Sequence, residues 1–290
     1  MEKLTLPRGR ALSLEPFAIM GVVNTTPDSF HVASRHRARE DALNAALAMI
    51  EGGATVVDIG GESTRPGSSY IGEEEELERV VPAVEAIRGA SDVAISVDTR
   101  KASVWKAASD AGADILNDVS ALRDSPEAGR LIAASGSPVV LMHMKGEPLT
   151  MQDDPRYEEC FDEVRSFLLE AVARVEAAGV ARDRIVLDPG IGFGKRLEDN
   201  LSLLSRLDEL CALGFPVLVG LSRKGFVGSL TGRPIDGRLA GSLGAAAAAW
   251  TLGARIFRVH DVAETRDLLL VVSALLASRL GGRQGAKVGA

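Results

Sequence analysis

The sequence is poor in the patterns that mark disulfide frameworks and membrane spans. Only two cysteines, Cys160 and Cys211, occur in 290 residues. Neither belongs to a C-x-x-C pair, so we expect two separate thiols in a reducing compartment. No run of about 18 apolar residues is present, and the charged N-terminus lacks the hydrophobic core of a signal peptide. We therefore expect a soluble, cytoplasmic protein.

Metal-ligand spacing and strong positive charge are also missing. The four histidines, His31, His36, His143 and His260, are scattered without H-x-x-x-H spacing, so no zinc site built by the protein alone is expected. The formal net charge of −7 gives no electrostatic reason to expect nucleic acid or an anionic membrane as a partner. Basic residues should instead be concentrated wherever an anionic ligand binds.

What the chain does contain is a repeated pattern of short apolar runs that end in polar residues. The runs are Ala18–Val23, Thr55–Ile59, Val93–Val97, Ile115–Leu116, Val139–Met142, Ile185–Leu187, Pro216–Leu221 and Arg255–Val259. Amphipathic stretches follow them: Glu40–Glu51, Glu73–Ile87, Lys101–Ala111, Pro126–Ser135, Tyr157–Ala178, Leu197–Leu210, Leu239–Leu252 and Val262–Leu280. This alternation predicts an α/β protein, a single (β/α)8 TIM barrel over residues 1–280, with residues 281–290 as a disordered tail. The alternative, a doubly wound sheet, would usually spare some strand ends from function.

Polar residues at three strand ends indicate a binding site for a heterocycle. In a barrel all carboxyl ends of the strands meet at one rim, where active sites are built. Asp98, Asn117 and Asp188 would lie there, and carboxylate and amide groups can bind the guanidine-like edge of a ring. Each residue could alternatively cap the helix that follows. Three of them at one rim favour the binding site.

Two loops add groups suited to anions and planar rings. The segment Gly60–Gly67 reads GGESTRPG, a sharply turned loop with two hydroxyls and an arginine; a plain structural turn is the alternative. The segment Asp188–Lys195 reads DPGIGFGK, which matches neither a dinucleotide fingerprint nor a P-loop. We interpret it as a flexible wall that presents Phe193 to a planar ligand.

Basic residues lie at the ends of the seventh and eighth runs, where barrels commonly hold phosphate. They occur in Ser222-Arg223-Lys224 and in Arg258-Val259-His260, and surface salt bridges are the alternative. His143 lies between two methionines and is expected to pack beneath the site. A Mg²⁺ ion held jointly by a substrate phosphate and a few protein oxygens is compatible with this sequence.

At these motifs the chain closely resembles the dihydropteroate synthases, from about Ile19 to Ala277. The resemblance is carried by NTTPDSF at 24–30, GGESTRPG at 60–67, SVDT at 96–99, ND at 117–118, LMHM at 141–144, DPGIGFGK at 188–195, SRK at 222–224 and RVHD at 258–261. It implies a transferase of folate biosynthesis that condenses 6-hydroxymethyl-7,8-dihydropterin diphosphate with 4-aminobenzoate and releases pyrophosphate. It also implies a homodimer, a Mg²⁺ requirement and inhibition by sulfonamides.

The resemblance also implies roles for individual residues. The pterin would contact Asp98, Asn117, Met142, Asp188, Lys224 and Arg258. The diphosphate would contact Asn24, Ser63, Arg65, Arg258 and His260, with Asn24 also binding Mg²⁺. The 4-aminobenzoate pocket would contain Thr64, Pro66, Phe193 and Ser222, with Lys224 beside them. The residues expected to act directly in catalysis are Arg65, Lys224, Arg258 and His260.

One departure from the family pattern concerns the first loop. After Phe30 the family usually continues Ser-Asp-Gly-Gly, whereas this chain has His31-Val32-Ala33-Ser34. Val32 thus replaces an aspartate associated in the family with the cationic intermediate, so we expect slower turnover with pterin binding intact. Two alternative functions would use the same pterin-binding residues: a pterin-dependent methyltransferase and a catalytically silent pterin-binding paralogue.

Overall fold

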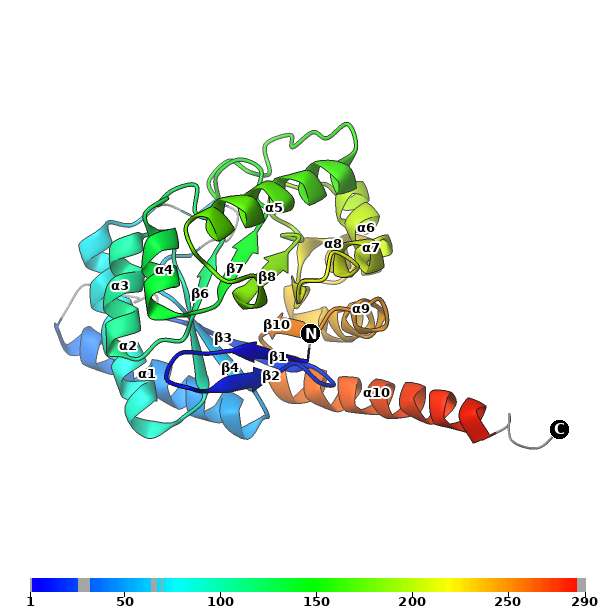
Figure 1. Ribbon diagram of the computed structural model, residues 1–290, viewed down its shortest axis with the longest axis horizontal. Coiled ribbons are helices and arrows are strands. Elements are labelled where there is room, and N and C mark those ends of the chain that lie inside the picture. The colour runs from blue at the N-terminus through cyan, green and yellow to red at the C-terminus, as the bar shows by residue number, and fades with distance from the viewer. Residues whose placement is uncertain (1, 26–31, 64–66, 69, 286–290) are drawn as a thin grey trace.

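Eight parallel strands form the centre of the protein, as the sequence predicts. The computed structural model describes residues 2–25, 32–63, 67–68 and 70–285 (Figure 1). The sheet has the order β8-β7-β6-β5-β4-β3-β10-β9. Its strands are β3 (Ala18–Asn24), β4 (Val56–Gly60), β5 (Ala94–Asp98), β6 (Ile115–Asp118), β7 (Val139–Met142), β8 (Ile185–Asp188), β9 (Leu218–Gly220) and β10 (Ile256–Val259).

The two edges of this sheet meet, so it is a barrel. Leu187 of β8 forms a parallel bridge to Val217, just before β9, and its backbone N–H donates to the Pro216 carbonyl at 2.9 Å. Every residue of β4 and of β5 is buried, as expected for parallel strands covered on both faces. This burial explains why the strands read as apolar runs and not as alternating patterns.

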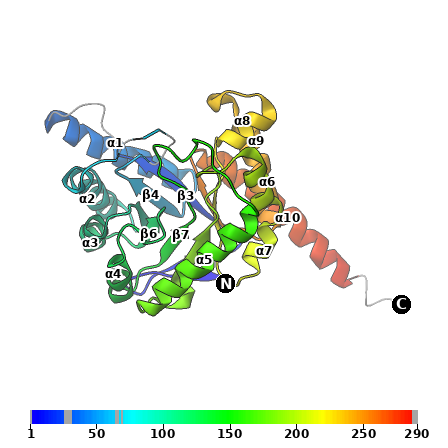
Figure 2. The same ribbon diagram turned by 90° about the horizontal axis from the view of Figure 1, so that it is seen from above.

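Helices surround the barrel (Figure 2). They are α1 (Val32–Glu51), α2 (Glu73–Ala90), α3 (Ala102–Ala111), α4 (Ala128–Ser135), α5 (Cys160–Ala177), α6 (Leu197–Ser205), α7 (Leu207–Cys211), α8 (Gly225–Thr231), α9 (Leu239–Thr251) and α10 (Val262–Gly285). Two 3-10 turns, Arg182–Arg184 and Ile235–Gly237, precede β8 and α9. None of the described helices combines the length and apolarity needed to cross a membrane.

Several element boundaries differ from those predicted. The stretch Leu197–Leu210 forms two helices, α6 and α7, separated at Arg206. The short helix α8 was not predicted at all. Helix α10 runs to Gly285 and projects beyond the barrel in Figure 1, so the predicted disordered tail from residue 281 begins too early, and residues 286–290 lie outside the described part.

An N-terminal hairpin, also not predicted, closes the amino end of the barrel. Strands β1 (Lys3–Thr5) and β2 (Ala11–Ser13) pair antiparallel. Leu4 and Leu12, with the neighbouring Leu6 and Leu14, form a separate buried cluster with residues at the starts of the barrel strands, including Val56 and Ala94 of β4 and β5, Ile115 of β6, Leu218 of β9 and Ile256 of β10. The hairpin thus covers the end opposite the polar rim.

One buried carboxylate ties this hairpin to the barrel. Asp114 is fully buried and pairs with Arg8 and Arg10 from the hairpin and with Arg88 from α2, the last at 2.7 Å. Its Oδ2 also accepts the backbone N–H of Ile95 at 2.9 Å. Because three arginines surround this one buried carboxylate, a neutral side chain at position 114 would leave their positive charges without an anionic partner.

We therefore expect Asp114→Asn to lower the free energy of unfolding by about 3 kcal/mol, the usual loss when one partner of a buried pair is removed. Asp110→Asn is the control, because Asp110 forms an exposed pair with Lys106 and such pairs contribute under about 1 kcal/mol. Urea unfolding compares the two variants. Equal, small losses would contradict the anchoring role of Asp114.

Candidate active site

A cleft opens at the carboxyl ends of the barrel strands. Its wide outer part has a volume of about 820 Å³ and continues into a narrower hollow between the strand ends. Both parts share the side chains of Val22, Asp98, Phe193, Ser222, Lys224, Arg258 and His260. Contributions from β3, β5, β8, β9 and β10 and the loops after them make this a single site, as the sequence predicts.

The floor of the cleft contains an arginine held by two carboxylates. Arg258 of β10 donates from Nε to Asp58 Oδ2 at 2.7 Å and from Nη2 to Asp98 Oδ2 at 2.9 Å. Asn117 of β6 donates to the same Asp58 oxygen at 3.2 Å. The paired carboxylates raise the pKa of Arg258 above its usual range, against the effect of burial. The guanidinium therefore stays charged and joins β4, β5 and β10.

Asp58 was not recognised from the sequence. It is fully buried inside β4, in a run that reads as apolar, and its Oδ1 accepts no hydrogen bond from the described residues. A lone carboxylate within a run of valine and isoleucine was the available signal. Such a group is expensive to bury without a cation, so its presence implied a partner such as Arg258.

Two carboxylates that line the hollow, Asp98 and the additional Asp188, have raised pKa values. Burial raises the pKa of Asp98 to about 7, although Arg258 acts in the opposite direction. Burial likewise raises the pKa of Asp188 to about 6, opposed first by the Gly190 N–H that donates to its Oδ1 at 2.7 Å. Asn117 lines the hollow between them. This edge offers carboxylate and amide groups to a ligand that donates several N–H bonds.

Lys224 and Phe193 also line the hollow. The Lys224 ammonium lies 4.0 Å from the centre of the Phe193 ring, a cation–π distance. Burial and the neighbouring Arg258 lower the pKa of Lys224 to about 8. Phe193 packs in one apolar cluster with Val119, Met142, Met144 and Met151. Val119 and Met142 line the hollow with it, and such apolar side chains suit the face of a planar ring.

The outer part of the cleft has the hydroxyl and imidazole groups. His260 Nδ1 lies 3.1 Å from Ser222 Oγ, and the hydroxyls of Ser63 and Ser68 are 2.8 Å apart. Asn24, exposed at the end of β3, lines the same part. Arg223 was predicted, as part of Ser222-Arg223-Lys224, to help bind an anionic ligand. Its guanidinium instead binds Asp261 through bonds of 2.6 and 3.0 Å.

His143 lies beneath this site, as expected from the sequence. It is buried, its Nδ1 lies 2.9 Å from Lys195 Nζ, and its ring meets the edge of Phe167. Burial and the charge of Lys195 lower the pKa of His143 to about 2. The imidazole is therefore neutral at physiological pH and supports the loop that follows β8.

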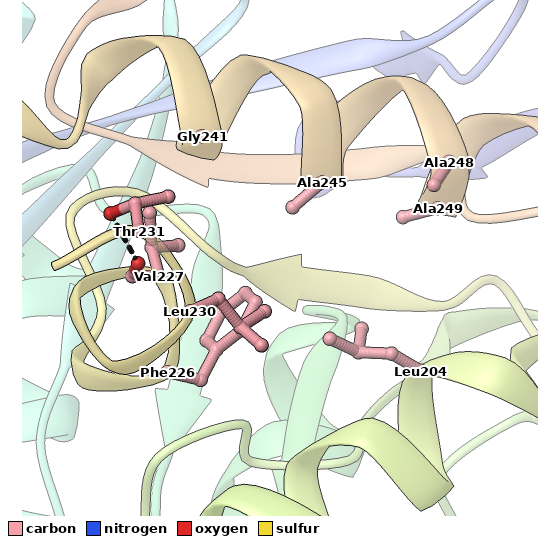
Figure 3. A pocket seen from close by; sticks show the side chains of 9 residues that line it. All are labelled: Leu204, Phe226, Val227, Leu230, Thr231, Gly241, Ala245, Ala248 and Ala249. Atoms are coloured by element: carbon pink, nitrogen blue, oxygen red, sulfur yellow. Dashed lines mark hydrogen bonds between the residues drawn. The ribbon is translucent and has the colours of Figure 1, made fainter.

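A second hollow borders the outer part of the cleft at Phe226, which lines both. Leu204 of α6, Phe226 and Leu230 of α8 and the alanines of α9 line it (Figure 3). No charged side chain is among its lining residues, so it lacks the groups that a charged substrate requires.

Comparisons with known proteins agree with this geometry. Residues 20–260 match the family model of pterin binding enzymes. The dihydropteroate synthase of Escherichia coli K12 is 47% identical over 272 residues, which cover 94% of this chain and 96% of the relative. The chain belongs to the dihydropteroate synthase family.

Solved structures of the family have the same fold. The Xanthomonas albilineans dihydropteroate synthase with 4-aminobenzoic acid superposes with a TM-score of 0.88 at 46% identity, covering 95% of this chain and 98% of that one. The Yersinia pestis enzyme in a sulfonamide drug complex gives 0.88 at 45% identity, covering 95% and 99%.

The structure brings most of the predicted dihydropteroate synthase residues together. Those that line the cleft are Asn24, Ser63, Asp98, Asn117, Met142, Asp188, Phe193, Ser222, Lys224, Arg258 and His260. Thr64, Arg65 and Pro66 lie outside the described residues, so their predicted roles stay predictions. Val32 is the first residue of α1, and its side chain is outside the described part.

The buried carboxylate edge predicts how pterin binding responds to charge. Asp188→Asn should weaken binding of a pterin ligand at least tenfold, about the contribution of one charge-assisted hydrogen bond. Because the pKa of Asp188 is raised to about 6 and that of Asp98 to about 7, wild-type affinity should fall as the pH falls below about 7 and these carboxylates become protonated.

Calorimetry with the pterin ligand across this pH range tests both statements. Asp183→Asn is the control, since Asp183 is exposed in the turn before β8. A folded Asp188→Asn protein with wild-type affinity and an unchanged pH profile would show that this carboxylate does not bind the pterin.

Proposed function

We propose that the protein condenses 6-hydroxymethyl-7,8-dihydropterin diphosphate with 4-aminobenzoate to form 7,8-dihydropteroate and pyrophosphate. The observation that carries the proposal is the convergence of Asp98, Asn117 and Asp188 on one hollow that cationic and aromatic side chains also line. A pterin has a guanidine-like edge with several N–H donors, which complements carboxylate and amide acceptors. Its planar ring suits the apolar side chain of Met142.

The chemistry requires positioning and charge stabilisation more than a protein nucleophile. The bond between the pterin methylene and the diphosphate oxygen breaks, and its electron pair leaves with the diphosphate. The aromatic amine then forms the new C–N bond and loses a proton. Cations beside the leaving group stabilise the charge that develops there, and we assign this task to Arg65, Arg258 and His260, with Ser63 as a hydrogen-bond donor.

In this proposal the amine substrate binds against side chains of the outer part of the cleft. Phe193, Ser222 and Lys224 line the mouth of the hollow, and Thr64 and Pro66 would complete the pocket. The Xanthomonas albilineans relative was solved with 4-aminobenzoic acid, which supports this assignment for a chain 46% identical to it. Lys224 thus stands between the two substrates, where an ammonium can favour the departing anion and the aminobenzoate carboxylate.

We further propose that Mg²⁺ enters with the diphosphate and takes Asn24 as its protein ligand. The Asn24 amide oxygen is a hard donor of the kind Mg²⁺ prefers, and Mg²⁺ commonly keeps several waters and binds few protein groups. Asn24 is exposed on the part of the cleft that also contains Ser63 and His260. When bound, the ion would neutralise charge on the diphosphate.

We also propose a cytoplasmic homodimer. The unpaired thiols of Cys160 and Cys211 fit a reducing compartment. Exposed Leu270, Val271 and Leu275 on α10 and the apolar hollow beside α9 in Figure 3 supply hydrophobic area of the kind that interfaces bury. Slower turnover from Val32 stays a prediction of the sequence.

The proposed function makes a specific kinetic prediction. Pyrophosphate should be released only when both substrates are present, whereas a methyltransferase or a silent pterin-binding paralogue would release none. Sulfonamides should inhibit competitively with 4-aminobenzoate, because they mimic it and Phe193 is still accessible from the cleft. Inhibition competitive with the pterin diphosphate instead would place the amine pocket elsewhere.

A further inference from the structure

The loop that carries Phe193 is pressed against a neighbouring backbone. Gly190 and Gly194 have φ values of 66° and 62°, and a Cβ on them would lie 1.9 Å from the His143 carbonyl oxygen and 2.1 Å from that of Lys145. Only glycine permits this approach. The loop after β8 therefore lies directly on the segment after β7, and the carbonyl groups of Phe193 and His143 face one buried space.

One buried ammonium occupies that space. Lys195 is 3% exposed, and its Nζ lies 2.9 Å from His143 Nδ1, 3.1 Å from the Phe193 carbonyl oxygen and 3.3 Å from the His143 carbonyl oxygen. An ammonium has three N–H donors, so the three acceptors match it. None of the three is charged, and burial lowers the pKa of Lys195 to about 7.

The energetic cost of burying the Lys195 ammonium implies that it has a role other than packing. Burying an ammonium among neutral acceptors is unfavourable, and an apolar side chain would fill the volume at lower cost. What the ammonium adds is a bond to the Phe193 peptide from beneath. The ring on that same residue lies 4.0 Å from Lys224 Nζ and lines the cleft, so a shift of this peptide would move the wall of the site.

We propose that Lys195 is a positioning residue for the aromatic amine substrate. By joining the Phe193 carbonyl to the His143 carbonyl and imidazole, it fixes the ring against which 4-aminobenzoate binds. Binding of the guanidine-like edge of the pterin depends on other side chains, those of Asp98, Asn117 and Asp188. Lys195 therefore controls affinity for the amine and its mimics. Its effect on the pterin subsite is small, because its charge is the weakest of the influences on the pKa of Asp188. This inference rests on the proposed function.

The test compares Lys195→Met with Lys145→Met. Methionine keeps the length and volume of the chain but removes all three donors. Lys145 is a neighbouring lysine whose ammonium instead lies 3.3 Å from Glu163 at the surface, with its side chain 41% exposed. For Lys195→Met we expect the KM for 4-aminobenzoate and the inhibition constant of a sulfonamide to rise together by about tenfold, the scale of one lost charge-assisted bond.

Two further quantities separate positioning from general damage. The dissociation constant of a pterin ligand, by calorimetry, should stay within about twofold of wild type, and kcat should fall far less than KM rises, as for lost uniform binding of the amine. Lys145→Met should match wild type in all four measurements. An unchanged KM in folded Lys195→Met, or an equal loss of pterin affinity, overturns the proposal.

A milder variant covers the case in which Lys195→Met does not fold. Lys195→Gln keeps two N–H donors and should raise the KM for 4-aminobenzoate by about threefold; an unchanged KM in that variant overturns the proposal. Failure of both variants to fold would make Lys195 a purely structural residue and overturn it as well. Absence of pyrophosphate release by the wild-type protein would instead refute the proposed function, independently of Lys195.

Discussion

The site depends on one shared cation, the Arg258 guanidinium between Asp58 and Asp98. The two carboxylates lie on neighbouring strands and would repel each other in a buried space without it. Arg258 bonds to both, at 2.7 and 2.9 Å, and so permits a dense group of acceptors at the centre of the rim. Asn117 joins through the same Asp58 oxygen. The acceptors that face the ligand are thus held in place before it arrives.

This arrangement suits a reaction in which the protein orients two planar substrates and stabilises the negative charge that develops on a departing diphosphate. Preorganised charges in a site with little water act more strongly than they would in solution. Asn117 and Asp188 line the narrow hollow alone, Asn24 and Ser63 line the outer part alone, and Asp98, Ser222 and His260 line both. The two parts meet at Lys224, whose ammonium is near enough to influence both.

The barrel and most of the site could be predicted because buried parallel strands read as short apolar runs and the polar residues follow them directly. Asp58 could not be found by the same logic, since it lies within a run and its role depends on Arg258, 200 residues away in sequence. The hairpin at Leu4 and Leu12 has three-residue strands, too short for a periodic pattern. The end of α10 at Gly285 was missed because glycines normally terminate helices.

The central claim is that Asp58 acts on ligand binding chiefly through Arg258. Asp58 does not line either part of the cleft, and its bond from Arg258, at 2.7 Å, is shorter than its bond from Asn117, at 3.2 Å. A double-mutant cycle with Asp58→Asn and Arg258→Met, read by calorimetry with a pterin ligand, tests it most directly. Each single variant should lose at least tenfold in affinity, and the double variant should lose little more than either one, because both remove the same interaction. Unchanged affinity in folded Asp58→Asn, or losses that simply add, would contradict the account.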